Sequence, residues 1–278
     1  MLTDFMACDL GGTRTKVGLF NGFSWQVEVF PTAPTKEGWR YQLSQFYKQY
    51  QPAHWGLALP GLIDPKTGDW LRASVFNRHS WSRAELEYWL EEALPKPAII
   101  TTDMNATAWA VFGKTSGTLL QLSTGTGVRV IENGVILIDP KTPSMGLLAS
   151  SRGRQVTHRG QTKSFEEWLS LRGVRSRAGR QGKILALLEE MEEIDLYLSV
   201  LKEWLRLLEG SSPYPQPIYL SGGCALGLRA KIAASLQKEG IEVRFVDNAE
   251  KIGLQGIYQA YIRGLRKESL YRRQMPVS

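Results

Sequence analysis

Cysteine and histidine are scarce in this chain. Its 278 residues contain two cysteines, Cys8 and Cys224, and three histidines. Two cysteines are too few for a disulfide framework and lack metal-ligand spacing, so the composition favours a reducing compartment. The sequence also lacks a basic leader, and no stretch approaches the roughly 20 apolar residues that a membrane span needs. We therefore expect a soluble, cytoplasmic protein that does not bind a membrane.

The balance of charge is basic, with a formal net charge of +7. Clustered cations bind nucleic acid by releasing counterions from its phosphates, which raises that function as a hypothesis. The cations are spread over residues 151–160, 171–183 and 262–274, and acidic residues lie between the last two segments. We therefore expect no nucleic-acid partner, and interpret the charge as a solvated basic face or as a match to an anionic small molecule.

Apolar runs that suit strands alternate with amphipathic stretches that suit helices, which indicates an α/β fold. A chain of this length with 43% hydrophobic residues can bury one large core or two of ordinary size, and we expect two domains. Local signals predict two helices opened by the capping boxes Ser82/Glu85 and Ser164/Glu167, a basic loop over residues 150–163, and a long helical region from Ile184 to about Leu208.

Two segments share one pattern, which suggests an internal duplication. Residues 6–22 and 118–134 each contain an apolar strand, a Gly/Thr turn, a second strand and a closing Asn-Gly pair typical of a hairpin. Such turns leave backbone N–H groups and hydroxyls open to oxygen-rich anions. We expect both turns, with a third glycine turn at Gly222-Gly223, to hold phosphate across a cleft between duplicated halves.

Two aspartates come at the ends of predicted strands. Asp9 precedes the first Gly/Thr turn, where a carboxylate can bind Mg²⁺ directly or through water and the metal would offset triphosphate charge; the alternative is an exposed strand end. Asp103 follows the strand "PAIITT" and precedes a helix, a position that can present a general base to a cleft. The alternative for Asp103 is an N-cap of that helix.

In their order along the chain, these motifs resemble those of the ROK family of sugar kinases, within the superfamily of actin, sugar kinases and the heat-shock ATPases. "DLGGTRTKVGLF" is similar to the family's first phosphate motif, "ALPGLIDPKTG" to its "PGPVD" stretch and "FNRHSW" to its "PNLxGW" segment. "TTDMNATAWA" resembles "ENDANAAA", "LSTGTGVRVIENG" the second phosphate motif and "YLSGGCALGLRAKIAASL" the adenosine motif. The resemblance covers almost the whole chain.

This resemblance implies a two-domain actin-like ATPase (ribonuclease H-like) α/β fold with duplicated βββαβα-type halves and an interdomain cleft. Residues 1–112 would form the N-terminal domain, with the C-terminal helix 258–278 packed on it, and residues 113–257 the C-terminal domain. The implied activity is an ATP-dependent kinase that transfers the γ-phosphate to a hydroxyl of a sugar or sugar-like acceptor, using ATP and Mg²⁺. Relatives commonly form dimers, so a homodimer is one expectation.

The resemblance also assigns roles to residues. Asp103 would be the catalytic base and contact the acceptor, together with Asn77 and with Glu166, which lies four residues before Ser170 as in the family's "ExxxSG" stretch. From the residues alone, Asn77 could form a turn and Glu166 could be an acid in a first helical turn. The ATP phosphates would be held by Asp9, which would also hold Mg²⁺, and by Gly11, Gly12, Thr13, Arg14, Thr124, Gly125, Thr126, Gly127, Gly222 and Gly223. Arg14 could instead be a solvated turn residue.

The sequence departs from the family in three places. The segment after the second phosphate motif contains His158 and no cysteine, so we expect no zinc site. "GLLAS" stands where the family has "GExGH", and Thr102 replaces the Asn before the catalytic Asp. Because each well-placed hydrogen bond contributes about 1 kcal/mol, a loss of the Glu and His contacts leaves the acceptor and the phosphorylated hydroxyl open.

Two other functions stay open. A non-catalytic sugar or nucleotide sensor on the same fold is favoured by the missing acceptor contacts. Its repressor form is not expected, because the phosphate motif begins at Asp9 and leaves no room for an N-terminal helix-turn-helix domain. An ATPase or acyl-phosphate-forming relative would be recognised by ATP turnover without added sugar.

Overall fold

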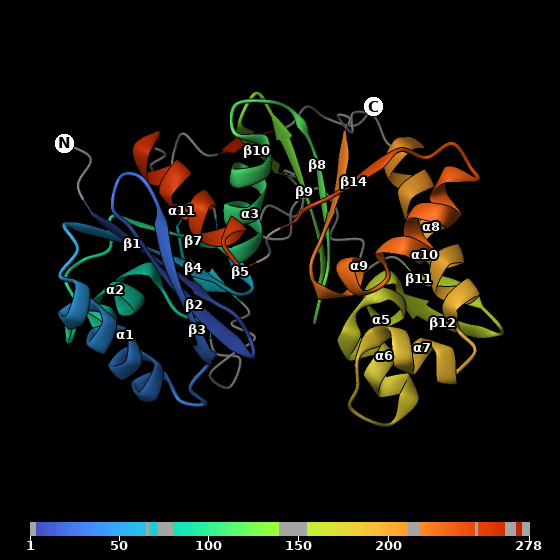
Figure 1. Ribbon diagram of the computed structural model, residues 1–278, viewed down its shortest axis with the longest axis horizontal. Coiled ribbons are helices and arrows are strands. Elements are labelled where there is room, and N and C mark those ends of the chain that lie inside the picture. Colours follow the sequence, from blue (N-terminus) through green and yellow to red (C-terminus); the bar gives the residue numbers. More distant parts are fainter. Residues whose placement is uncertain are drawn as a thin grey trace. The chain divides into compact units, whose positions relative to one another are not determined.

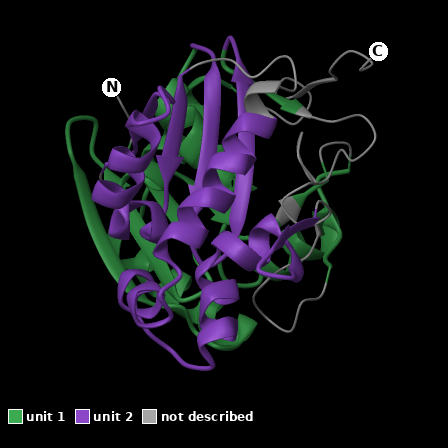
Figure 2. Cartoon of the chain, turned by 90° about the vertical axis from the view of Figure 1, so that its right-hand side faces the viewer, with its two compact units in different colours: residues 1–114, 134–144, 250–278 green, residues 115–133, 145–249 purple. Residues whose placement is uncertain are grey.

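The computed structural model describes residues 4–64, 67–71, 80–138, 155–210, 217–247, 250–264 and 271–273. The chain forms two compact units, shown in different colours in Figure 2. Unit 1 comprises residues 1–114, 134–144 and 250–278, and unit 2 comprises residues 115–133 and 145–249. A five-stranded sheet lies in unit 1, four strands of a second sheet lie in unit 2, and both units bury many hydrophobic residues.

A five-stranded sheet forms the centre of unit 1 (Figure 1). The strand order is β3-β2-β1-β4-β7; β1 pairs antiparallel with β2 and parallel with β4, which in turn pairs parallel with β7. All six residues of β1 are buried, so this strand lies between two covered faces. The strands are β1 (Phe5–Leu10), β2 (Arg14–Phe20), β3 (Trp25–Pro31), β4 (His54–Leu59) and β7 (Ile99–Thr102).

Helices cover both faces of this sheet, and the alternation of β1 decides which side chain meets which layer. Met6, Cys8 and Leu10 join a core that includes Trp39 of α1 and Trp89 of α2. Phe5 and Asp9 point the opposite way, toward α11. The helices of unit 1 are α1 (Lys36–Tyr50), α2 (Arg83–Glu91), α3 (Asp103–Phe112) and α11 (Ile252–Ile262), and its short strands are β5 (Leu62–Ile63), β6 (Trp70–Leu71), β10 (Val135–Ile138) and β15 (Tyr271–Arg273).

In unit 2, four strands run in the order β14-β13-β8-β9. The described helices of this unit lie between β9 and β14 along the chain and pack on one another. Buried aromatic residues of this unit include Phe165 and Trp204, whose rings stack at 5.5 Å. The elements are β8 (Gly117–Leu122), β9 (Thr126–Glu132), β11 (Gln155–His158), β12 (Gln161–Ser164), α5 (Phe165–Leu169), α6 (Leu171–Ala178), α7 (Ile184–Glu190), α8 (Ile194–Gly210), β13 (Ile218–Ser221), α9 (Gly223–Gly227), α10 (Arg229–Gln237) and β14 (Val243–Phe245).

The two units repeat one strand arrangement. The order β2-β1-β4-β7 in unit 1 corresponds to β9-β8-β13-β14 in unit 2, with one antiparallel pair followed by two parallel pairs in each. The closing Asn-Gly turns differ in detail. Asn133 and Gly134 have φ of 50° and 77°, as a type I′ hairpin requires, whereas Asn21 accepts hydrogen bonds through its side chain from the N–H groups of Phe23 and Ser24.

Several local predictions are confirmed and others are wrong. Both predicted capping boxes form, at the starts of α2 and α5. The predicted loop at 150–163 is wrong from Gln155 onward, because β11 and β12 form a hairpin there. Its turn residues Arg159 and Gly160 have φ of 50° and 74°, and the hydroxyls of Thr157 and Thr162 hydrogen-bond across the strands at 2.8 Å.

Two predicted helices have different bounds. The long helical region after Ile184 is broken between α7 and α8, where Glu192 has φ of 53°, a left-handed conformation that stops a helix. The last helix begins at Ile252 and ends at Ile262 rather than spanning residues 258–278, and residues 271–273 form β15, which pairs parallel with β10.

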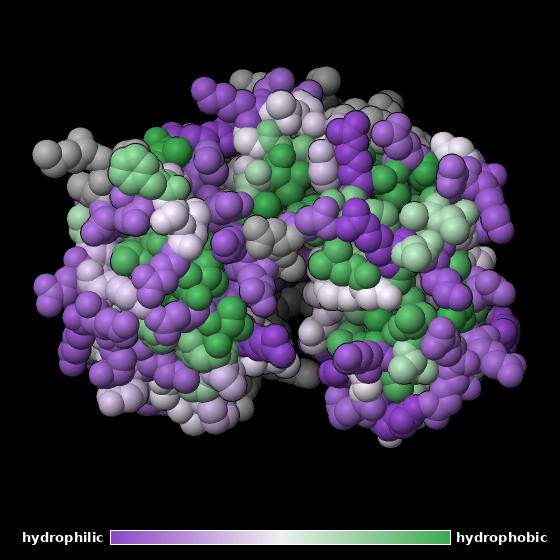
Figure 3. All heavy atoms as spheres, viewed as in Figure 1, coloured by the Kyte–Doolittle hydropathy of each residue, from purple (hydrophilic) through white to green (hydrophobic). Residues whose placement is uncertain are grey.

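Hydrophilic side chains are spread over the face shown in Figure 3, and hydrophobic side chains lie between them in smaller groups. Among the described residues, the most exposed large hydrophobic side chain is Phe23, in the turn between β2 and β3. None of the described helices is both long and apolar enough to cross a bilayer.

Candidate functional site

The first Gly/Thr turn joins β1 to β2 and is fixed by the end of β3. The Gly11 N–H donates to the Arg14 carbonyl at 3.0 Å, and the Thr32 N–H donates to the Thr13 carbonyl at 3.1 Å. The Thr32 hydroxyl donates to the Gly11 carbonyl at 2.7 Å and lies 3.0 Å from the buried Thr15 hydroxyl. These contacts use carbonyl groups of the turn and hold it in one conformation.

The two glycines of this turn have different reasons to be glycine. A Cβ at Gly11 would lie 2.4 Å from the Arg14 carbonyl oxygen, so the fold itself excludes a side chain there. A Cβ at Gly12 would meet nothing within 4 Å, and Gly12 is not among the residues with positive φ. The local structure therefore requires Gly11 but not Gly12, which leaves space beside the Gly12 backbone.

Asp9 is a buried carboxylate, with 6% of the residue exposed. Its Oδ2 accepts from the Lys16 ammonium at 2.9 Å. A Cβ on Gly253 would lie 2.9 Å from the same Oδ2, so the carboxylate also lies beside the first turn of α11, where the helix dipole favours a negative charge. Lys16 and the helix together compensate for the burial of Asp9.

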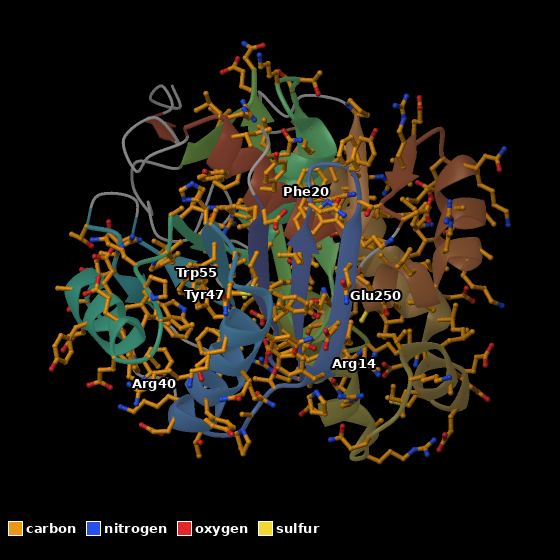
Figure 4. The ribbon with its side chains drawn as sticks, turned by 60° about the vertical axis from the view of Figure 1, so that its left-hand side comes forward. Arg14, Phe20, Arg40, Tyr47, Trp55 and Glu250 are labelled. Carbon is orange, nitrogen blue, oxygen red and sulfur yellow. The ribbon has the colours of Figure 1, made fainter. Side chains whose placement is uncertain are left out.

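Arg14 begins β2 and is exposed. Figure 4 shows it at the end of β2 opposite to Phe20, which belongs to an aromatic group with Trp25 and Tyr258. The turn end of β2 is therefore polar and cationic, whereas its other end packs against α11.

Asp103 is the first residue of α3 and is partly exposed. The N-cap of this helix is Thr102, whose Oγ1 accepts from the Asn105 N–H at 3.2 Å. The alternative role for Asp103 as the N-cap is therefore wrong. One Asp103 oxygen, Oδ1, accepts from the Met104 N–H at 2.8 Å. This bond orients the carboxylate at the helix start.

Within the described part of unit 1, the predicted site residues lie at one edge of the sheet. Strands β1, β4 and β7 are parallel and neighbouring, so their carboxyl ends lie at the same edge. Asp9 is the next-to-last residue of β1, the Gly11–Thr13 turn follows β1, and Asp103 follows β7. Crevices at the carboxyl ends of parallel strands are where open α/β sheets bind ligands.

The second Gly/Thr turn, Ser123–Gly127, is held by α6 in unit 2. The Leu171 and Arg172 N–H groups donate to the Ser123 and Thr124 carbonyls at 2.8 and 3.2 Å. The Ser123 N–H donates to the Gly125 carbonyl at 2.9 Å. The hydroxyl oxygen of Thr126 is buried and has no hydrogen-bond partner among the described residues. A buried orphan hydroxyl costs free energy, which a ligand that bonds to it would recover.

The third glycine turn repeats the division seen in the first. Gly222 has φ of 93°, and a Cβ there would lie 2.4 Å from the Leu122 carbonyl oxygen, so the fold requires this glycine. A Cβ at Gly223 would meet nothing within 4 Å. In both glycine pairs, the first glycine is demanded by the fold and the second leaves open space.

Glu166 lies in α5 with 8% of the residue exposed, and its Oε1 would lie 3.4 Å from a Cβ on Gly125. The predicted acceptor carboxylate and the second phosphate turn are thus neighbours within unit 2. Defined donors satisfy carbonyl groups of α5. The Ser170 N–H donates to the Glu166 carbonyl, and Arg177 donates to the carbonyls of Glu167 and Trp168. The Tyr197 hydroxyl donates to the Leu169 carbonyl.

Both cysteines are buried and poorly reactive. Burial raises the pKa of the Cys8 thiol far above its usual range and that of the Cys224 thiol to about 12. Cys224 lies beside the second turn, with Sγ 3.4 Å from the Ser123 carbonyl oxygen.

Among the described residues, no group of three or more His, Cys, Asp or Glu side chains could hold a metal ion. His158 lies 3.1 Å from Glu203 and meets the edge of the Trp168 ring.

Two residues near the site were missed by the sequence analysis. Lys16 lies directly opposite Asp9 in the β1–β2 register, and Thr32 anchors the first turn. The partner of Lys16 follows only from the β1–β2 register, which the sequence of β2 alone does not contain. Asn77 and the "GLLAS" segment lie outside the described residues.

Comparison with known proteins gives one matching family and a set of similar folds. The model of the ROK family matches residues 5–196. Similar solved structures include a ROK hexokinase from Thermus thermophilus, with 22% identity, a TM-score of 0.69, and coverage of 94% of this chain and 99% of that chain. A ROK family glucokinase from Streptomyces griseus, in complex with glucose and AMPPNP, has 18% identity, a TM-score of 0.65, and coverage of 91% and 97%.

A ROK family transcriptional regulator, a homologue of the E. coli MLC protein, is also similar, with 17% identity, a TM-score of 0.62, and coverage of 94% of this chain and 79% of that chain. No curated protein sequence matches the chain. At these identities the solved structures establish the fold, which is the two-domain α/β fold of the actin-like ATPases.

Proposed function

The chain belongs to the ROK family, and from this premise we propose that it is an ATP-dependent kinase that phosphorylates a hydroxyl of a sugar or sugar-like acceptor. Both kinases and a regulator occur among its structural relatives, so the family alone does not decide between catalysis and sensing. The choice between catalysis and sensing therefore rests on the residues of this chain.

The proposal rests on the different roles of the two glycines in each pair, Gly11-Gly12 and Gly222-Gly223. Gly12 and Gly223 leave open space that the fold does not need, beside backbone N–H groups that suit phosphate oxygens. The orphan hydroxyl of Thr126 adds a donor at the second turn. These features fit a polyphosphate, so we assign the ATP phosphates to the turns at Gly11–Arg14, Thr124–Gly127 and Gly222-Gly223.

Phosphoryl transfer requires an aligned acceptor and a way to remove its proton. In our proposal Asp103 accepts that proton, since Thr102 already caps α3 and the residue is partly exposed. Asn77 and Glu166 contact the acceptor. Asp9 offers the hard oxygen ligand that Mg²⁺ prefers, and the metal when bound would balance part of the triphosphate charge. Unit 1 corresponds in this scheme to the acceptor domain, and unit 2 to the adenosine domain.

The test is ADP release from MgATP across a panel of sugars, amino sugars and polyols, with Asp103→Asn as the matched control. We expect turnover with one acceptor class and a loss of at least about 100-fold in the variant, because a general base contributes on that order. The variant should keep the thermal stability and the ATP affinity of the wild type.

Two outcomes would replace the proposal. ATP binding without acceptor-dependent turnover would support a sugar or nucleotide sensor, the function of a regulator on this fold. ADP release without any acceptor, abolished in the variant, would support an ATPase or acyl-phosphate-forming enzyme.

A further inference from the structure

Strand β3 forms one edge of the unit 1 sheet (Figure 1), and its only neighbour among the described strands is β2. Some of its backbone groups point away from β2. Just beyond the strand, the Thr32 N–H donates to the Thr13 carbonyl, in the same register as the β2–β3 pair. Hydrogen-bonded pairs alternate along antiparallel strands. The even-numbered residues of β3 therefore bond to β2, and Trp25, Val27 and Val29 direct their N–H and carbonyl groups outward.

The side chains of the same three residues form an apolar stripe. Alternate residues of a strand share a face of the sheet, and for Trp25, Val27 and Val29 this is the face on which α11 lies. The Trp25 ring meets that of Tyr258 in α11 at 6.1 Å. Val29 is 38% exposed, and Phe23 in the turn before β3 is 95% exposed. The outer edge of β3 therefore combines unused backbone groups with exposed hydrophobic surface.

This edge lacks the features that normally protect an edge strand against pairing, which are lysine, proline, bulges and charges that point inward. Residues 25–30 contain no lysine, arginine or proline. The register with β2 runs without a break from Trp25 to Pro31, so β3 has no bulge. Its one charged residue is Glu28, whose carboxylate accepts a hydrogen bond from the Tyr50 hydroxyl of α1. The edge is therefore open to another strand.

We propose that β3 pairs with the β3 of a second copy of this chain, antiparallel and about a two-fold axis at Val27, so that two five-stranded sheets become continuous. Such a contact requires a surface that is complementary to itself. In this register Val27 lies opposite the partner's Val27 and Trp25 lies opposite the partner's Val29, so outward backbone groups meet outward backbone groups. On the other face Gln26 lies opposite the partner's Glu28, and an amide can donate to a carboxylate.

Charge and backbone groups select this register over its neighbours. An axis at Glu28 would put two carboxylates directly opposite each other, which is destabilising, and would set Trp25 against Pro31, which has no N–H to donate. An axis at Gln26 would leave Val29 opposite the β2–β3 turn instead of a strand. One strand pair is a small interface beside the standard size of about 1,600 Å², so we expect a reversible dimer that dissociates on dilution.

The first test is sedimentation velocity of the full chain over a series of concentrations. We expect a monomer–dimer equilibrium, and Val27→Lys should raise the dimer dissociation constant about 100-fold or more, because two ammonium groups then meet at the axis. Val27→Glu should do the same, and an equimolar mixture of the two variants should dimerise again. Val243→Lys, at a half-buried valine in the edge strand β14, is the matched control and should leave the constant unchanged.

The second test fixes the register by mild oxidation of single-cysteine variants. Val27→Cys should form a disulfide-linked dimer, because Cα atoms of a hydrogen-bonded pair lie about 5.5 Å apart, a distance that a disulfide spans. Glu28→Cys should remain monomeric. Cys8 and Cys224 are buried and serve as the unreactive background. If Val27→Lys unfolds, as circular dichroism would show, the Val27→Cys result decides the question.

Three results would overturn the inference: a wild type that stays monomeric at every concentration, a dimer that Val27→Lys leaves intact, or cross-linking through Glu28→Cys instead of Val27→Cys. The first would leave the β3 edge to an extended segment of another protein. These measurements use neither ATP nor an acceptor, so their outcome is independent of the proposed kinase activity.

Discussion

At the scale of single residues, neighbouring glycines in this chain serve different purposes. A side chain does not fit at Gly11, because a Cβ there would lie 2.4 Å from the Arg14 carbonyl oxygen. A Cβ at Gly12 would have no neighbour within 4 Å. Sequence gives both as members of one phosphate motif and cannot separate them. The separation depends on how the chain returns at Arg14, which is a property of the folded turn.

This difference predicts opposite results for two similar substitutions. Gly11→Ala should destabilise unit 1 by about 2 kcal/mol or more, because a backbone carbonyl must move. Gly12→Ala should leave the stability within about 0.5 kcal/mol of the wild type and weaken ATP binding, because its methyl group enters the space assigned to phosphate. Denaturant unfolding and calorimetric titration with ATP measure the two effects. A Gly12→Ala variant with unchanged ATP affinity would remove the main support for the phosphate site.

Whether a site residue could be predicted from the sequence depended on how much of the folded structure its role involves. Asp9, Asp103 and the glycine turns could be proposed because each motif is short and continuous. Lys16 could not be proposed as a site residue, because its relevance depends on the cross-strand register that puts it opposite Asp9. The sequence also could not tell which residue caps α3, since Thr102 and Asp103 are both good N-caps and only the backbone geometry selects Thr102.

At the scale of elements, the short helix α5 depends on α6 and α8 to keep Glu166 beside the second turn. Arg177 of α6 donates to carbonyls at the end of α5, lies over the Trp168 ring at 4.8 Å and pairs with Glu193 at 3.0 Å. Its side chain is nearly buried. A five-residue helix cannot satisfy its own terminal carbonyls, so these contacts replace an ordinary cap.

Loss of this arginine should therefore cost stability in unit 2. Arg177→Gln leaves Glu193 and the α5 carbonyls without their donor, and we expect a loss of about 3 kcal/mol in the free energy of unfolding. Arg180→Gln, which removes an exposed pair with Glu190, is the matched control and should cost less than about 1 kcal/mol. Urea denaturation of both variants provides the comparison. Equal losses would mean that Arg177 does not support α5.

The β11–β12 hairpin was missed by the sequence analysis. The β11–β12 hairpin lies in a basic, polar segment whose strands contain only one buried hydrophobic residue, Val156. Its stabilising contacts are a cross-strand pair of threonines, the Trp168 indole donating to the Val156 carbonyl, and Lys163 over the Trp168 ring. Periodicity detects strands through apolar alternation, so a strand held mainly by polar contacts gives little signal.

At the scale of the whole molecule, the duplication was the most informative sequence feature, because it predicted two sheets with one strand plan. The matching orders β2-β1-β4-β7 and β9-β8-β13-β14 carry that prediction. The helices between the strands were less predictable, since the described part of unit 2 has α5, α6, α7 and α8 between β9 and β13, where unit 1 has α1 alone between β3 and β4. Helix number depends on local stops such as Glu192 and on tertiary packing, neither of which a repeat pattern contains.

Stability against acid is a property of both units together. Hydrogen bonds from Ser82 lower the pKa of Glu85 in unit 1, hydrogen bonds from Ser164 lower that of Glu167 in unit 2, and a hydrogen bond from Lys202 lowers that of Glu239. A carboxylate whose pKa is lower in the folded state contributes stability at pH values above its unfolded pKa of about 4.3. That contribution is lost as the pH falls through the folded pKa, because the unfolded state then binds more protons.

We therefore expect the melting temperature to stay nearly constant from pH 7 to about pH 5 and to fall steadily below about pH 4.5. Because Glu167→Gln removes one of the titrating carboxylates, the variant should melt lower at pH 7 and lose less between pH 5 and pH 3 than the wild type. Thermal unfolding followed by circular dichroism across this pH range measures both slopes. A wild-type decline that begins between pH 7 and pH 6 would contradict the assignment of the acid sensitivity to these carboxylates.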